Sequence, residues 1–196
     1  MKFTFDNKKI SGILTVVPQN ELRFEDEIEN YNFSTKQSMK LKLVMGYDKR
    51  RIAHKGVCSS DLCEFGMNYL FNNNLLNKDE VDALIMVTQS PDYFMPATSN
   101  ILHGKLGLKK DIFCIDICQG CCGFLIGLIQ AFMLLEQKNI NKVVLDWWNF
   151  SCHFLCDFDD SGHHGCVNAR TLCSRICGRN YERKCCIRRN AVAARI

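Results

Sequence analysis

The apolar residues of this chain fall into two patterns that alternate along the sequence. Short apolar runs predict strands. The predicted strands are residues 9–17, 81–88, 112–117 and a run that begins at 142–145. Apolar residues at helical spacing predict helices between these runs. The predicted helices are residues 59–72, 99–106 and 122–137, with a mixed helix and loop at 24–42. Strands that alternate with helices predict an α/β fold with a largely parallel sheet.

The predicted helix at 122–137 differs from the others because it is apolar on nearly every side, so we expect it to lie inside the protein. Cys121 stands at or next to its start, where unpaired amides and the helix dipole favour an anion. A thiol in such a place ionises more readily, and the thiolate is the nucleophile. Cys121 is therefore a candidate nucleophile. The alternative is that Cys118, Cys121 and Cys122 are small apolar residues that fill a core.

The run D-I-C-Q-G-C-C-G-F has a distinctive order of residue types. Asp116 is followed five residues later by Cys121, and then by Gly123 and Phe124. Three further blocks precede this run: ISGI at 10–13, GYDKRRIA at 46–53, and LIMVT, PATS and LGL within 84–108. Together the four blocks resemble the β-ketoacyl-acyl-carrier-protein synthase III family, whose members are condensing enzymes of the thiolase-like superfamily.

The resemblance implies the amino-terminal half of a thiolase-like fold, with a mixed, mostly parallel sheet and a buried central helix. It also implies a Claisen condensation through an acyl-Cys121 intermediate. In this family the Cys attacks the thioester of an acyl donor and holds the acyl group as a new thioester. Malonyl on acyl carrier protein then loses carbon dioxide, and the resulting carbanion attacks the acyl-enzyme. The reaction belongs to fatty-acid or related acyl biosynthesis.

The resemblance further implies partners and substrate-binding residues. The predicted substrate-binding residues are Met95 and Phe124, and Met95, which precedes Pro96, would shape the acyl pocket of the other subunit in a homodimer. Plain packing is the alternative for Met95. The implied partners are acyl carrier protein and an acyl thioester, with no cofactor and no metal. Known members grip the adenine of coenzyme A with a Trp and an Arg, whereas the matching residues here are Lys40 and Val44. The donor is therefore left open between coenzyme A and another carrier.

The composition changes at residue 146. Residues 1–145 contain 14 Lys, 3 Arg and 6 Cys, whereas residues 146–196 contain 1 Lys, 7 Arg and 7 Cys. We divide the chain into a thiolase-like amino-terminal half, 1–145, and an aberrant, irregular or disordered tail, 146–196. Our hypothesis for the tail is a shifted reading frame near codon 146, and the alternative is a zinc site. Its candidate ligands are Cys152, Cys156, His163, His164, Cys166, Cys173, Cys177, Cys185 and Cys186.

Two groups that the family uses for catalysis have no counterpart in this sequence. They are a His in a His-Gln-x-Asn-like motif and a later Asn, which stabilise the developing oxyanion and enolate. His54 and His103 are interpreted instead as ordinary structural or surface residues. We therefore predict a truncated and impaired enzyme. The alternative is a non-catalytic vestigial or interaction module.

The overall composition argues against several other classes of protein. Hydrophobic residues make up 47% of the 196 residues, which is ample for the core of one domain. The net charge of +4 is mild, and no basic and aromatic stripe indicates nucleic-acid binding. The apolar stretch 121–135 falls short of the roughly 20 residues that span a bilayer. With no signal peptide visible, the 13 cysteines are predicted to be free thiols in a reducing, cytoplasmic compartment.

Overall fold

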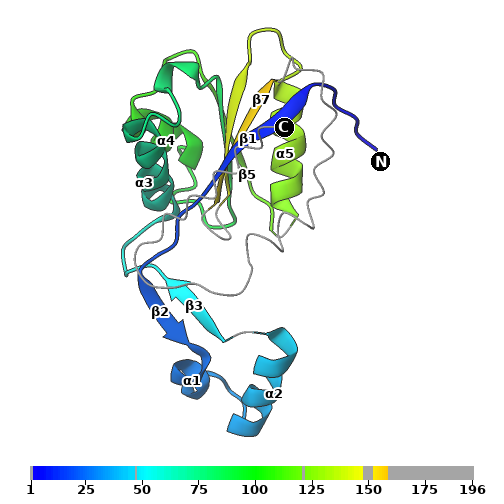
Figure 1. Ribbon diagram of the computed structural model, residues 1–196. Helices are drawn as coiled ribbons and strands as arrows, with labels where there is room; N and C mark the ends of the chain where they lie inside the picture. Colours follow the sequence, from blue (N-terminus) through cyan, green and yellow to red (C-terminus); the bar gives the residue numbers. More distant parts are fainter. Residues whose placement is uncertain (1, 47, 121, 148–151, 159–196) are drawn as a thin grey trace. The chain divides into compact units, whose positions relative to one another are not determined.

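The computed structural model describes residues 2–46, 48–120, 122–147 and 152–158, with the backbone alone for residues 45 and 152–158 (Figure 1). These residues form two compact units. The larger unit contains residues 2–16 and the described residues from 58 to 158, and the smaller unit contains residues 17–57. Cys121 and the candidate zinc ligands other than Cys152 and Cys156 lie outside the described residues.

The described part of the larger unit is built on a five-stranded mixed sheet with the strand order β1-β7-β6-β4-β5. Its strands are β1 (Lys8–Thr15), β4 (Ala83–Val87), β5 (Phe113–Ile117), β6 (Lys142–Trp147) and β7 (Cys152–Phe158). Strands β5, β4 and β6 run parallel, whereas β7 runs antiparallel to both β6 and β1. The predicted α/β class with a mixed sheet is confirmed.

Helices cover both faces of this sheet. They are α3 (Ser59–Asn72), α4 (Thr98–Leu106) and α5 (Gly123–Leu134), and a short 3-10 helix, η2 (Lys78–Glu80), precedes β4. Figure 1 shows α3 and α4 on one side of the sheet and α5 on the other. The predicted helix at 59–72 is confirmed at both ends, and the predicted helix at 99–106 begins one residue earlier than expected.

Strand β4 is the centre of the larger unit, because every one of its residues is completely buried. Its side chains alternate between two cores, as the pleat of a strand requires. Leu84 and Met86 belong to the core that includes α3 and α4, whereas Ile85 and Val87 belong to the core that includes α5. The prediction of a strand buried on both faces is confirmed.

The smaller unit contains an antiparallel pair of strands, β2 (Asn20–Arg23) and β3 (Lys49–Ile52). Between them lie α1 (Phe24–Glu27), the 3-10 helix η1 (Ile28–Asn30) and α2 (Thr35–Met45). Phe24 is buried at the centre of this unit, and its ring stacks on Tyr31 with centroids 5.5 Å apart. Helix α2 begins with a capping box of Ser34 and Gln37 and ends at Gly46, whose φ of +66° suits a residue without a Cβ.

Helix α5 and the segment after residue 145 differ from the sequence-based expectations. Helix α5 covers the sheet, but Leu125, Ile126 and Met133 are 40% to 46% exposed, so its burial is confined to the side that faces the sheet. No element is predicted after residue 145, yet β6 continues to Trp147 and β7 follows in the segment expected to be irregular. Strand β7 pairs with neighbours on both sides, and its sequence CHFLCDF has an apolar residue at every second position, a strand period that the prediction missed.

Candidate active site

The candidate site lies where the parallel strands β4 and β5 end. Parallel strands have their carboxyl ends at the same edge of the sheet, and ligands bind at that edge in open α/β sheets. The Thr88 amide donates a hydrogen bond to the Ile117 carbonyl oxygen at 3.1 Å, which joins the two strand ends. The chain therefore leaves the sheet side by side after Val87 and after Ile117.

Asp116, the first residue of the motif, fixes the start of the neighbouring helix α4. Its Oδ2 accepts a hydrogen bond from the Thr98 amide at 2.6 Å, and its Oδ1 accepts one from the Ser99 amide at 2.8 Å. The N-cap residue of α4, Ala97, has no side chain that can accept these bonds. A carboxylate on β5 thus takes the place of the missing cap and also suits the positive end of the helix.

The residues that flank Cys121 form a tight approach to α5. The Gly123 amide donates to the Gly120 carbonyl oxygen at 2.8 Å, and the Ile126 amide donates to the Cys122 carbonyl oxygen at 3.2 Å. The Cys122 thiol lies 3.7 Å from Oε1 of Gln119. Cys121 itself is outside the described residues, so its predicted place at the helix start stays a prediction that rests on these neighbours.

Two glycines allow α5 to lie close against the sheet. A Cβ on Gly123 would stand 2.6 Å from Cγ1 of Val87, and a Cβ on Gly127 would stand 2.8 Å from both Cγ2 of Val87 and Cδ1 of Leu145. A Cβ closer than 3 Å to another carbon atom would overlap with it, so any residue larger than glycine would push α5 away from the sheet. Gly123 and Gly127 are four residues apart and share one face of the helix. Gly123 of the motif is therefore a packing residue.

The two predicted substrate-binding residues have opposite environments. Phe124 is buried, and its ring centroid lies 5.3 Å from that of Trp147. Met95 is 87% exposed and follows the exposed residues Tyr93 and Phe94 in the loop between β4 and α4. The substrate-binding roles of Phe124 and Met95 stay predictions.

Among the described cysteines, environment separates accessible thiols from inert ones. Burial, with Asp146 and Asp92 adding to it, raises the pKa of Cys63 well above its ordinary value. Burial and the neighbouring Asp116 also raise the pKa of Cys114. A thiol with a raised pKa is a poor nucleophile at neutral pH, which argues against both.

Cys118 and Cys122 are exposed, so the alternative that they fill a core is wrong for both. Residue type alone does not indicate which side of a turn a small apolar residue takes, so the sequence held no signal for their exposure. Both thiols flank the predicted nucleophile, and their variants therefore serve as controls for its reactivity.

The histidines that the structure describes at His54 and His103 have ordinary structural contacts. His54 lies 3.2 Å from the Asn20 amide nitrogen, and Nε2 of His103 lies 2.8 Å from the Lys109 carbonyl oxygen. Within the described residues, no group of three or more His, Cys, Asp or Glu side chains could hold a metal ion. Nor does any helix in that part of the chain have the length and apolar character needed to cross a membrane.

The sequence has clear relatives among known proteins. It is 39% identical over 146 residues to a protein of Campylobacter jejuni named as a 3-oxoacyl-[acyl-carrier-protein] synthase 3. The aligned region covers 74% of this chain and 41% of that protein. The chain is 34% identical over 102 residues to the β-ketoacyl-[acyl-carrier-protein] synthase III of Phocaeicola vulgatus. This aligned region covers 52% of this chain and 30% of that protein. This chain is a homologue of synthase III. No protein-family model matches it.

Solved structures of condensing enzymes share the fold. A 3-oxoacyl-(acyl-carrier protein) synthase of Burkholderia xenovorans superposes with a TM-score of 0.72 at 22% identity, over 81% of this chain and 50% of that chain. OleA of Xanthomonas campestris superposes with a TM-score of 0.68 at 18% identity, over 79% of this chain and 57% of that chain. The thiolase-like α/β fold predicted from the motif blocks is confirmed. The chain spans less than two thirds of the length of each of these synthase III relatives.

Proposed function

We propose that this chain accepts an acyl group on Cys121, as the first half-reaction of a synthase III-type condensing enzyme of acyl biosynthesis in the cytoplasm. The observation that supports this most is the position of the Cys121 segment. It follows the carboxyl end of β5, precedes α5, and is preceded by Asp116, which anchors α4. The printed names of the relatives point to the same reaction class.

The proposed step is a thioester exchange. The Cys121 thiolate attacks the carbonyl carbon of an acyl thioester, and a new carbon–sulfur bond forms as the bond to the donor sulfur breaks. The donor leaves as a thiolate and takes up a proton from solvent. In the complete reaction, malonyl on acyl carrier protein would lose carbon dioxide, and its carbanion would displace the Cys121 sulfur.

We propose that this chain by itself is impaired in that second step. The step needs donors that stabilise an oxyanion and an enolate, a large electrostatic contribution in such chemistry. The His-Gln-x-Asn-like motif that supplies them is absent from the sequence. His54 and His103 are engaged with Asn20 and Lys109 instead. Acyl transfer to Cys121 is therefore the activity to test first.

A second copy of the chain is the proposed partner at the edge of the sheet. Strand β5 is an edge strand of the described sheet, and Phe113 on it is 42% exposed. An edge strand presents unpaired backbone groups that another chain can pair with. The exposed loop from Tyr93 to Met95 leaves the adjacent strand β4, and by resemblance Met95 would reach the acyl pocket of the second copy.

The alternative function is a non-catalytic interaction module. The exposed apolar residues Leu125, Ile126 and Met133 on α5 favour it, because adjoining exposed apolar side chains mark surfaces that bind other chains. In this case the fold would be kept for binding, and Cys121 would form no acyl-enzyme.

Intact-mass measurement of the full chain with an acyl-N-acetylcysteamine thioester tests the proposal. We expect a mass gain equal to one acyl group, located on Cys121 by peptide mapping and lost in Cys121→Ala. The controls Cys118→Ala and Cys122→Ala remove exposed neighbouring thiols, and the adduct should persist in both. Absence of any adduct in the folded wild-type chain would reject acylation in favour of the interaction module.

A further inference from the structure

Two exposed cysteines share one short segment of the described chain. Cys118 and Cys122 are both exposed in the stretch between β5 and α5, with three residues between them, whereas the exposed Cys58 stands alone before α3. By contrast, Cys63 is buried and Cys114 is partly buried, and burial raises the pKa of both thiols. Reagents in solution therefore meet two neighbouring reactive thiols at the start of α5.

The segment that carries these two cysteines turns twice. The Gln119 amide donates a hydrogen bond to the Ile117 carbonyl oxygen at 3.1 Å, which closes a three-residue turn. The Gly123 amide donates to the Gly120 carbonyl oxygen at 2.8 Å, which closes a four-residue turn. In an extended chain the two cysteines would lie about 13 Å apart. The two turns shorten that span.

The Cys122 side chain points back along this segment. Its thiol lies 3.7 Å from Oε1 of Gln119, the residue that directly follows Cys118. A thiol is a weak hydrogen-bond donor, so this contact is easily given up. A disulfide needs its two Cα atoms within about 7 Å of each other. The turns and the direction of the Cys122 thiol both bring the pair toward that arrangement.

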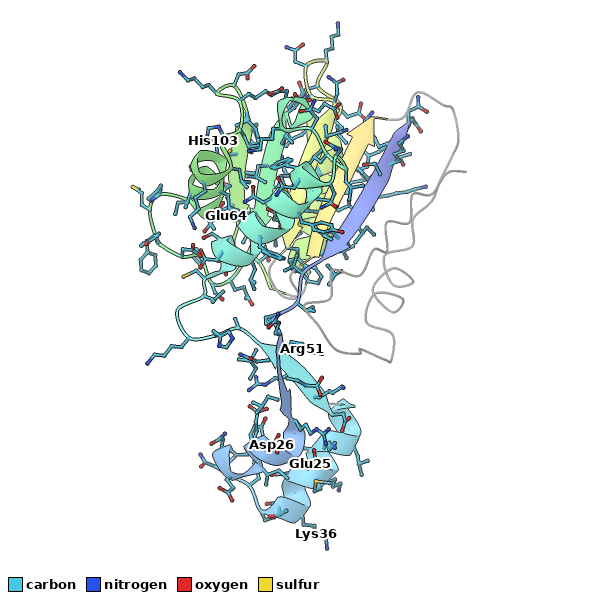
Figure 2. The ribbon with its side chains drawn as sticks, turned by 60° about the vertical axis from the view of Figure 1, so that its left-hand side comes forward. Glu25, Asp26, Lys36, Arg51, Glu64 and His103 are labelled. Carbon is cyan, nitrogen blue, oxygen red and sulfur yellow. The ribbon has the colours of Figure 1, made fainter. Side chains whose placement is uncertain are left out.

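Other uses of two neighbouring thiols fit the described residues less well. A structural zinc site takes four ligands, and the described side chains include no metal-binding group of three or more His, Cys, Asp or Glu. A thiol–histidine pair needs a His in contact with the sulfur. His103 comes from α4 (Figure 2), on the other side of the sheet from α5, and its Nε2 lies 2.8 Å from the Lys109 carbonyl oxygen. Disulfide formation needs no further side chain.

We propose that Cys118 and Cys122 form a reversible disulfide, and that this disulfide slows the acylation of Cys121. The second part rests on the proposed function. Cys121 lies between the two cysteines in the sequence, so the disulfide would close a small ring that contains it. The ring would restrict the backbone at the residue that has to meet the acyl donor. An exposed disulfide of this kind is readily reduced again, as in redox-sensing proteins.

The oxidant is a small disulfide compound, for which oxidised glutathione is the probe. One cysteine thiolate attacks a sulfur of oxidised glutathione, forms a mixed disulfide and releases one glutathione thiolate. The other cysteine thiolate attacks the protein sulfur of the mixed disulfide and releases the second glutathione thiolate. The two cysteines thus lose two electrons and two protons, and two molecules of reduced glutathione carry them away.

The test treats the full chain with oxidised glutathione at neutral pH, alkylates the remaining thiols and maps the disulfides by peptide mass spectrometry. We expect a disulfide between Cys118 and Cys122 in the wild type and in Cys121→Ala, detected as the loss of two hydrogen atoms from their peptide. When Cys118→Ala or Cys122→Ala is added to Cys121→Ala, the remaining thiol should keep glutathione, because no second thiol displaces it.

Matched controls remove cysteines outside this segment. Cys58→Ala removes another exposed thiol, and Cys114→Ala removes a partly buried thiol on β5. Both variants should form the disulfide between Cys118 and Cys122 in the same yield as the wild type. Circular dichroism spectra and thermal melts of all variants establish that the fold is retained.

The second arm compares acylation of the reduced and the oxidised wild-type chain by the acyl-N-acetylcysteamine thioester. Peptide mapping first establishes that Cys121 carries no glutathione in the oxidised sample. We expect the acyl mass gain to be about tenfold slower or more in the oxidised chain, because small misplacements of a reacting group have effects of this size. Reduction by a phosphine should restore the rate.

Glutathione attached separately to Cys118 and Cys122, with no disulfide between them, would overturn the proposal. An unchanged acylation rate in the oxidised chain would overturn its second part. Acylation that proceeds in a chain that forms no disulfide rejects the redox site alone. A disulfide that forms in a chain that is never acylated rejects the proposed function and keeps the redox site.

Discussion

At the scale of single residues, carboxylates hold backbone amides of distant segments in this structure. Asp116 accepts two amides at the start of α4, and Asp82, at the entrance of β4, accepts the amides of Asn141 at 2.7 Å and Lys142 at 3.1 Å. Asp82 also pairs with Lys109. These charge-assisted bonds are stronger than neutral ones, so Asp116 ties β5 to α4, and Asp82 ties the start of β4 to the start of β6.

Asp82→Asn is expected to weaken stability in a pH-dependent way. Burial raises the pKa of Asp82, but the hydrogen bonds from Lys109, Asn141 and Lys142 outweigh it and leave the pKa below its ordinary value. The ionised form therefore stabilises the fold above about pH 4, the pKa range of an unfolded Asp. This stabilisation is lost as the pH falls through the lower pKa of the folded state.

Urea unfolding at a series of pH values checks this expectation. At pH 7 the variant should lose about 1–2 kcal/mol of unfolding free energy, and the difference from wild type should shrink below about pH 4. A difference that stays constant down to pH 3 would contradict the role of the charge.

Asp116→Asn is expected to loosen the start of α4. An Asn keeps one acceptor oxygen, so one of the two amides of Thr98 and Ser99 loses its partner along with the charge. The loss of a helix cap costs about 1 kcal/mol. We expect that decrease in the unfolding free energy and faster hydrogen exchange at the first turn of α4. The comparison variant is Asp111→Asn, at an exposed position, and an equal loss in both would exclude a specific role for Asp116.

At the scale of elements, the glycines of α5 decide how closely the helix lies on β4 and β6. Gly123 and Gly127 have no room for a Cβ, whereas Gly104, inside α4, has open space around it. The same substitution therefore has opposite consequences in the two helices. In α5 it strains the packing, and in α4 it adds helix propensity.

Gly127→Ala should destabilise the protein by about 1–3 kcal/mol, because its Cβ meets Val87 and Leu145 at 2.8 Å. The matched control, Gly104→Ala, should be neutral or stabilising by up to about 1 kcal/mol. Thermal unfolding of both variants provides the comparison. Equal stability of the two variants would show that α5 can move away from the sheet without cost.

The sequence predicts an element well where burial of its side chains produces an apolar pattern. It predicts an element poorly where an exposed strand is defined by its backbone pairing with another strand. The run 81–88 is apolar because β4 is buried on both faces, and its prediction is confirmed. Strands β2 and β3 escaped prediction because charged side chains hold them together: Lys49 and Arg51 both form ion pairs with Glu21. Strand β7 escaped prediction although Cys152, Phe154, Cys156 and Phe158 alternate along it, because the change in composition after residue 145 led us to expect an irregular tail.

The candidate site was predictable in part for a similar reason. The order of strand, motif and helix could be predicted from apolar runs on each side of Cys121. The bond from Asp116 to Thr98 could not, because it joins residues 18 positions apart that have no shared pattern. A signal was present, since Ala97 precedes α4 without a capping side chain and some other acceptor had to serve its first amides.

At the scale of the whole molecule, the two units have separate cores. Neither apolar cluster of the larger unit includes a residue from 17–57, and the smaller unit has its own buried centre at Phe24. The predicted boundary at residue 146 is a different division and stays a prediction. The larger unit thus has the internal packing that independent folding requires, whereas Phe24 is the one buried apolar side chain among the described residues of the smaller unit.

Replacement of residues 17–57 by a flexible Gly/Ser linker tests this separation. We expect the larger unit to keep its sheet and to unfold cooperatively, because its two cores are intact. Circular dichroism melts and the binding of an apolar dye measure the outcome. A broad, non-cooperative melt with strong dye binding would mean that the larger unit depends on residues 17–57.

The close fit at Gly123 has a consequence for how relatives of this chain can be sorted. A relative that has lost the activity but kept the fold would still need glycine at the position of Gly123, because a Cβ there would clash with Val87. The cysteine at the position of Cys121 could be replaced in such a relative. The glycine thus indicates that the packing of α5 is kept, whereas, under the proposed function, the cysteine indicates that the chemistry is kept.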